Sequence, residues 1–245
     1  RKEDRMEPKK FIKTLEDGSK SALSVAVACF IVGVVIGMMG ATGIALRVGD
    51  AILTMTQGSL ALTLIATMLL AVALGMGMPT TASYVMASAV GAPALILLGC
   101  KPLDVHFFVF YFAALSSITP PVCVGAYTAA GIAGADPNRT AIASMRLGLA
   151  GFIIPFVFIY SPELMLTNVT NWVSFGVAVV TACVGVFSLA VATEGYALGP
   201  ISLPLRFLAF AAAILLIVPG IVTDAAGIVL LALVVVLSRR AGTGR

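Results

Sequence analysis

The stretch Gly75-Met76-Gly77-Met78-Pro79-Thr80-Thr81 lies in the middle of a charge-free segment that runs from Ser59 to Leu98. Its glycines and proline interrupt the helix between two apolar arms of helical length. The interruption falls near the middle of the bilayer, where backbone groups without hydrogen bonds are tolerated least. A second break follows at Ser116-Ser117-Ile118-Thr119-Pro120-Pro121. Neighbouring interruptions of this kind are typical of membrane transporters that bind small solutes with opened backbone.

The composition predicts an integral membrane protein. The chain is 60% hydrophobic and only 11% charged, with a mean hydropathy of +1.09. A soluble domain with these values would expose a very large apolar surface. Several stretches supply the roughly 20 apolar residues that a helical span needs. We therefore predict an all-α membrane protein without a soluble domain.

The charges argue against a nucleic-acid-binding protein, and the cysteines argue against a zinc-binding or disulfide-stabilised protein. Seven of the fifteen basic residues lie in the first twenty positions, interleaved with five acids, which indicates a cytoplasmic flank and no nucleic-acid partner. Four single cysteines, Cys29, Cys100, Cys123 and Cys183, lack the spacing of a zinc site or a disulfide framework. We expect no metal of transition type and no cofactor.

The pattern of apolar stretches divides the chain into three regions. The predicted elements are a cytoplasmic arm or loop at 1–20, a transport region at 21–165 (a span to about 46, a hairpin at 59–98, a broken helix at 105–134 and a span at 146–160), and transmembrane segments with a short cytoplasmic tail at 166–245. The first hairpin arm reaches only about 24 Å, so a re-entrant hairpin and two full spans both remain open. The chain starts without Met, and we expect it to be a fragment of a longer polypeptide.

Local signals refine these elements and give an orientation. Asp136-Pro137 predicts an N-cap followed by proline at the first helical position, and Pro155 predicts a kink. Pro219-Gly220 and Thr223-Asp224 predict the connection between two last apolar arms. The basic residues place both ends of the chain in the cytoplasm, with only Arg47 and Lys101 outside.

The second break predicts an ion site. Prolines have no N–H, so Pro120 and Pro121 release the carbonyls of Ser116 and Ser117. With the hydroxyls of both serines and Thr119, these form a neutral oxygen cluster that suits a hard cation such as sodium. Thr119 is expected to cap a helix that begins at Pro120, whose free N–H groups attract an anion.

The hairpin tip repeats this chemistry, since Pro79 releases the Gly75 carbonyl and the threonines add hydroxyls. Either break alone fits a plain turn between packed spans, but the two together favour a solute or ion site. The candidate ion and substrate residues are Gly75, Gly77, Pro79, Thr80, Thr81, Ser116, Ser117, Thr119, Pro120 and Pro121, with sodium at Gly75, Ser116, Ser117 and Thr119. His106, beside Asp104, is expected to be structural, and Asp224 to be a turn cap.

Four motifs in order resemble a known family. They are Gly75 to Tyr84, His106 to Phe112, Ser117 to Val122, and Ala129 to Pro137. They resemble the C-terminal half of the large membrane subunit of TRAP transporters, most closely the fused permeases that work with TAXI-type periplasmic binding proteins. The resemblance covers about residues 21–165 and is weaker after Trp172.

The resemblance implies a bacterial inner-membrane secondary transporter of the elevator type, built from two inverted repeats of the ion-transporter superfamily. It implies uptake of organic acids (carboxylates), driven by sodium or protons and fed by a TAXI-type binding protein. This chain would hold one repeat, while the other repeat and the small-subunit portion would be fused upstream. The remaining alternatives are another transporter of the same superfamily and a non-catalytic scaffold subunit. An intramembrane enzyme is disfavoured, because the apolar segments lack paired carboxylates and an H-E-x-x-H motif.

Overall fold

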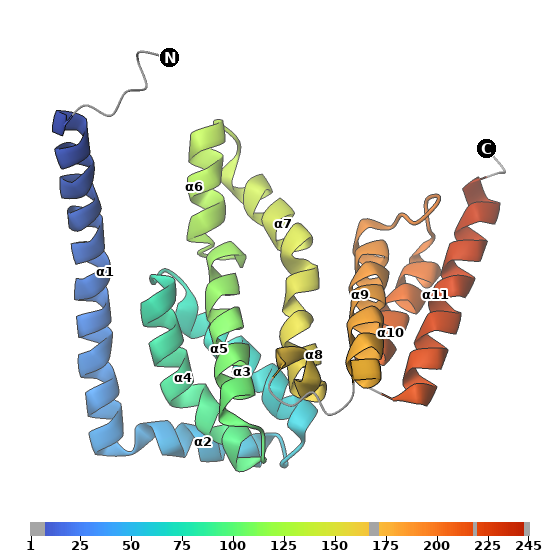
Figure 1. Ribbon diagram of the computed structural model, residues 1–245, viewed down its shortest axis with the longest axis horizontal. Helices are drawn as coiled ribbons and strands as arrows, with labels where there is room; N and C mark the ends of the chain where they lie inside the picture. Colours follow the sequence, from blue (N-terminus) through green and yellow to red (C-terminus); the bar gives the residue numbers. More distant parts are fainter. Residues whose placement is uncertain (1–7, 167–171, 218–219, 243–245) are drawn as a thin grey trace.

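The computed structural model describes residues 8–166, 172–217 and 220–242, and almost all regular structure in these ranges is helical (Figure 1). Helix α1 spans Pro8–Thr42 and is almost entirely exposed. Residues 8–20, predicted as an arm or loop, are therefore the first turns of this helix. Gly43, with φ of 67°, ends it, and α2 (Ile44–Met55) then runs across the end of the molecule.

A helical hairpin follows, made of α3 (Leu60–Gly75) and α4 (Thr80–Leu97). Both of its open ends lie on the side of α2, and its tip reaches only the level where α5 meets α6 (Figure 1). The two arms therefore form a helical hairpin, in which α4 is long and apolar enough to cross a bilayer and α3 is shorter. The re-entrant path of this hairpin stays a prediction. Gly49 of α2 packs against Pro93 and Ala94 of α4, so α2 braces the hairpin from outside.

The broken helix consists of α5 (Pro102–Leu115), a 3₁₀ turn (Ser116–Ile118) and α6 (Val124–Ala133), which stand one above the other (Figure 1). Gly134 ends α6 with a left-handed backbone, and α7 returns over Pro137–Gly148. Helix α8 (Ile154–Tyr160) follows α7 after a 3₁₀ turn. Pro155 lies in the first turn of α8, after a 3₁₀ turn over Leu149–Phe152, so it starts a helix instead of kinking one.

Three helices complete the described chain: α9 (Trp172–Glu194), α10 (Leu203–Ile217) and α11 (Ile221–Gly242). Arg206 of α10 donates hydrogen bonds to the carbonyls of Ala192 and Thr193, at 2.8 and 2.5 Å, and so satisfies the end of α9. The connection predicted at Pro219-Gly220 and Thr223-Asp224 is shorter than expected, because Gly220 lies between α10 and α11 whereas Thr223 and Asp224 lie inside the first turn of α11. Pro219 lies outside the described residues.

Buried side chains gather in two separate places. One core joins the hairpin to α5 and is built around Leu64, Leu95, Phe108 and Phe112, with Phe152 and Phe156 packed against it. The other lies among α9, α10 and α11 and includes Val191, Ala209 and Val234. Four described helical stretches are long and apolar enough to cross a bilayer, namely Pro8–Thr42, Thr80–Leu97, Trp172–Glu194 and Val222–Arg239. The first core holds the hairpin against α5 and so positions the site.

Candidate functional site

The hairpin tip touches the break at a single glycine. A Cβ atom on Gly75 would lie 2.5 Å from the Oγ of Ser116, 2.5 Å from the Oγ of Ser83 and 2.7 Å from the Cβ of Ser116. These distances are shorter than any normal contact, so only glycine allows the hairpin to approach this closely. All three residues are buried. The close approach brings together two segments that the sequence separates by some forty positions.

The rest of the tip is a tight turn that leads into α4. Gly77 has φ of 77° and lies against Val122, which follows the proline pair. Pro79 precedes the first turn of α4, and Thr80 and Thr81 begin that helix with exposed side chains. The Gly75 carbonyl, predicted to be released, accepts a long hydrogen bond of 3.4 Å from the N–H of Met78. The tip therefore supplies exposed hydroxyls more readily than a free carbonyl.

Three hydroxyls line the break, and each donates back to its own helix. Ser116 donates to the Ala113 carbonyl at 2.6 Å, Ser117 to Ala114 at 2.8 Å and Thr119 to Leu115 at 2.8 Å. Each hydroxyl proton is thus occupied, while the oxygen lone pairs remain able to accept or to coordinate. Ser116 and Thr119 are buried, whereas Ser117 is exposed.

The backbone of the break agrees only in part with the prediction. The Ser117 carbonyl has prolines three and four residues later, so no N–H of a following turn reaches it. The Ser116 carbonyl is not released, since it accepts from the N–H of Thr119 at 3.2 Å.

The helix beyond the break begins later than predicted. Thr119 does not cap a helix at Pro120, because α6 starts at Val124. The peptide bond between Pro120 and Pro121 is cis. The hydroxyl of Tyr127 donates to the Pro121 carbonyl at 3.0 Å and ties the intervening loop to α6. A Cβ on Gly125 would lie 3.2 Å from the Ser117 carbonyl oxygen, so the first turn of α6 packs closely against that carbonyl.

Two further hydroxyls inside the hairpin have no partner. The Oγ of Ser83 and the Oγ1 of Thr67 are fully buried, and neither forms a hydrogen bond in the described part of the chain. The candidate residues selected from the sequence did not include Ser83. Its position one turn after Pro79 was the available signal, because residues four apart share a helix face. Ser83 points at Gly75 and Ser116 and belongs to the site.

The other polar residues singled out by sequence lie elsewhere. His106 pairs with Tyr84, whose hydroxyl lies 3.0 Å from Nδ1, so it joins α5 to α4 as a structural contact. In the loop between α4 and α5, burial raises the pKa of the Cys100 thiol, and the nearby Asp104 carboxylate raises it further. Within the described ranges, no three His, Cys, Asp or Glu side chains come close enough to hold a metal ion.

These features define a multi-pass membrane protein in which a helical hairpin meets a broken helix. Residues 2–173 match the model of the DctM component of tripartite ATP-independent periplasmic transporters, and the chain belongs to this family. The chain matches neither the curated proteins nor the solved structures with which it was compared.

Membership makes the protein a TRAP-type membrane permease, and it implies a small membrane subunit and a periplasmic binding protein as partners. The family is one of transporters, which agrees with the prediction that the chain is not an enzyme. The match ends at residue 173, where α9 begins, and so leaves most of the α9–α11 core outside it.

Proposed function

We propose that this permease takes up carboxylates together with a coupling cation, and that both bind where the hairpin tip meets the break. The observation that carries the proposal is the contact of Gly75 with Ser116 and Ser83. It places buried hydroxyl oxygens, a released carbonyl and a positive-φ turn within one small region. Neutral oxygens of this kind suit sodium, because they replace part of its hydration shell without a carboxylate.

The same region offers N–H donors for an anion. Helices α4 and α6 both begin beside the contact, and neither has a side chain that caps its first N–H groups. Unbonded N–H groups and the positive end of a helix dipole favour a carboxylate. The hydroxyls of Thr80 and Thr81 lie at the start of α4 and add donors for the same ligand.

The wider setting of the proposal follows the family. The periplasmic partner is proposed to be of the TAXI type, and the membrane the bacterial inner membrane, with both ends of the chain in the cytoplasm. Both described ends lie at the same end of the molecule, which fits this orientation (Figure 1). Transport by an elevator motion between inverted repeats, with sodium or a proton as the coupling ion, completes the proposal.

The test is uptake in proteoliposomes that contain the permease with its small subunit and its binding protein. Labelled succinate, malate and glutamate serve as probes, and the sodium and proton gradients are varied separately. We expect Thr119→Val and Ser117→Ala to raise the sodium concentration for half-maximal uptake three- to tenfold, roughly the loss of one ligand.

Two matched controls exist in the chain. Thr128→Val removes an exposed hydroxyl that donates to a carbonyl four residues back, as Thr119 does, and Ser88→Ala removes one that donates three residues back, as Ser117 does. Both controls should leave the cation dependence unchanged. Normal cation dependence in Thr119→Val and Ser117→Ala would refute the site, and normal uptake in every variant would favour a scaffold role.

A further inference from the structure

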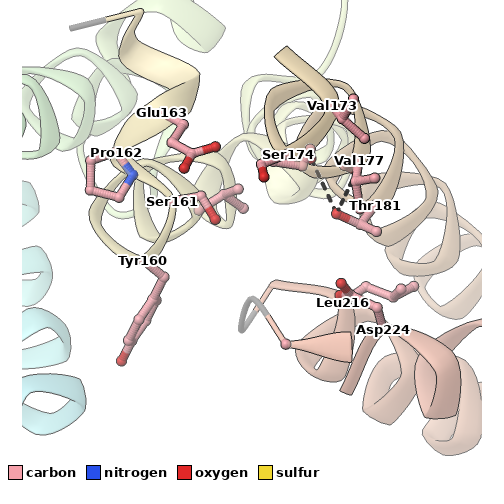
Figure 2. Close-up of a pocket in the computed structure, with 13 residues that line it drawn as sticks. Tyr160, Ser161, Pro162, Glu163, Val173, Ser174, Val177, Thr181, Leu216 and Asp224 are labelled. Carbon is pink, nitrogen blue, oxygen red and sulfur yellow. Dashed lines mark hydrogen bonds between the residues drawn. The ribbon is translucent and has the colours of Figure 1, made fainter. Parts of the chain in front are cut away.

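A cavity lies away from the hairpin, at the junction of α8, α9, α10 and α11 (Figure 2). Its volume is about 570 Å³, which lies within the range of sites for small organic molecules. Much of its wall is apolar, with Val157, Val173, Val177 and Leu216 among the lining residues. The cavity therefore has the size and the lining for a molecule larger than an ion.

The polar part of the wall is acidic. Figure 2 shows Glu163 and Ser161 on one side, with Ser174, Thr181 and Asp224 on the other. The described lining includes two carboxylates and several hydroxyls but no lysine, arginine or histidine. Such a wall attracts cations and repels the carboxylates proposed for the hairpin site.

One of these groups lacks the partner that a buried polar atom normally has. The Oδ1 atom of Asp224 is closed to solvent and accepts no hydrogen bond from the described residues. Ser161, only 9% exposed, lines the same cavity. A buried acceptor without a donor costs free energy, which a ligand carrying N–H groups would recover.

We propose that this cavity binds a primary ammonium group attached to a small apolar body. An ammonium has three donors, which the carboxylates of Glu163 and Asp224 and the Ser161 hydroxyl can accept. The apolar body would lie against the valines of α8 and α9 and against Leu216. A bare metal ion fits less well, because only two carboxylates line a space much larger than an ion.

The ammonium can come from a free amine or from a lipid headgroup. The cavity lies near the end of the helix bundle where α8 meets α9 and α10 meets α11 (Figure 1). This end faces the membrane surface if the helices cross the bilayer, so phosphatidylethanolamine is within reach. The chemistry recognised is the same in both cases, and the experiment separates the two sources.

The probe is benzylamine, titrated into the purified full chain in detergent, with the neutral benzyl alcohol as its counterpart. Binding is measured by isothermal titration calorimetry and compared with the fluorescence of Trp172, the only tryptophan, which directly precedes Val173 of the cavity wall. We expect saturable binding of benzylamine, and binding of benzyl alcohol at least tenfold weaker. Equal responses to the two compounds would show simple partitioning of the ring and would overturn the proposal.

Two variants test the two carboxylates separately, so the test remains possible if one variant does not fold. Asp224→Asn and Glu163→Gln should each weaken benzylamine binding about tenfold or more, as expected when a charge-assisted hydrogen bond is lost. Glu194→Gln, at the other end of α9 and exposed, is the matched control and should bind normally. Unchanged benzylamine binding in both test variants, with normal elution profiles, would overturn the proposal. Calcium binding that benzylamine does not displace would also overturn it.

Nanodiscs then identify the source. Weaker benzylamine binding in phosphatidylethanolamine than in phosphatidylglycerol assigns the ammonium to a lipid headgroup, whereas equal binding in both assigns it to a free amine. Wild-type protein that binds no benzylamine in detergent contradicts the proposal.

Discussion

Two glycines at the hairpin tip are required for different physical reasons. Gly75 provides space, because Ser116 and Ser83 occupy the position that a methyl group would fill. Gly77 provides backbone freedom, because its φ of 77° is unfavourable for residues with a Cβ, while its nearest side-chain neighbour lies at an ordinary 3.5 Å. The two positions should therefore respond to different substitutions.

Gly75→Ala should lower the free energy of unfolding by about 1–3 kcal/mol, as overpacking does. Rotation of the serine hydroxyls cannot relieve the clash, because the Ser116 Cβ is itself too close. Thermal unfolding in detergent measures the change. Gly131→Ala is the control, since a Cβ there meets nothing within 4 Å, and an equal loss of stability in both variants would contradict the argument.

Gly77→Ala should cost about 1–2 kcal/mol through backbone strain, and Gly77→Asn clearly less, because asparagine tolerates the left-handed region. The same unfolding measurement ranks the variants. At Gly75 the order should reverse, with asparagine worse than alanine, because size and not φ is limiting there. An identical order at both positions would mean that the two glycines are needed for the same reason.

Among the helices, the sequence predicted a boundary correctly where the signal consists of adjacent residues. Asp136-Pro137 predicted the start of α7, and the Asp136 carboxylate does accept from the N–H of Arg139 at 2.8 Å. The start of α6 was missed, because a pair of prolines followed by a loop leaves several residues able to begin the helix. Pro155 was misjudged because a proline inside a helix and one at its first turn look alike in sequence.

The N-cap of α7 gives a prediction at this scale. Asp136→Ala should destabilise the protein by about 1 kcal/mol, because it leaves the Arg139 N–H without its acceptor. Asp136→Asn should retain most of the stability, since its amide oxygen can accept the same bond. Thermal unfolding in detergent compares the variants. If the asparagine variant were as unstable as the alanine variant, the stabilisation would come from the carboxylate charge and not from the capping hydrogen bond.

For the whole molecule, the sequence predicted the class of protein but not the contacts between its helices. Composition and the two breaks indicated a multi-pass membrane protein with a hairpin and a broken helix, and the α3–α4 hairpin and the interrupted α5–α6 pair agree. The contact of Gly75 with Ser83 and Ser116 was not predictable, because it depends on how α3 and α5 pack. The acidic cavity was missed for the same reason, since Glu163 and Asp224 come from segments far apart in sequence.

The path of the chain across the membrane gives a prediction for the molecule as a whole. With all four cysteines replaced by alanine, Lys101→Cys and Asn138→Cys mark opposite ends of the broken helix (Figure 1). An impermeant thiol reagent added to intact spheroplasts should label position 101 fully and position 138 only after permeabilisation. Labelling of both positions from the same side would show that α5 and α6 together do not cross the bilayer.

The glycine contact at the hairpin tip also bears on motion. The backbone at Gly75 approaches Ser116 more closely than any side chain would permit, so the tip cannot slide along the break without first separating from it. We therefore expect the hairpin and the 3₁₀ turn to move together as one piece. A ligand held between them would then be carried at constant coordination distances, and its release would require these two surfaces to come apart.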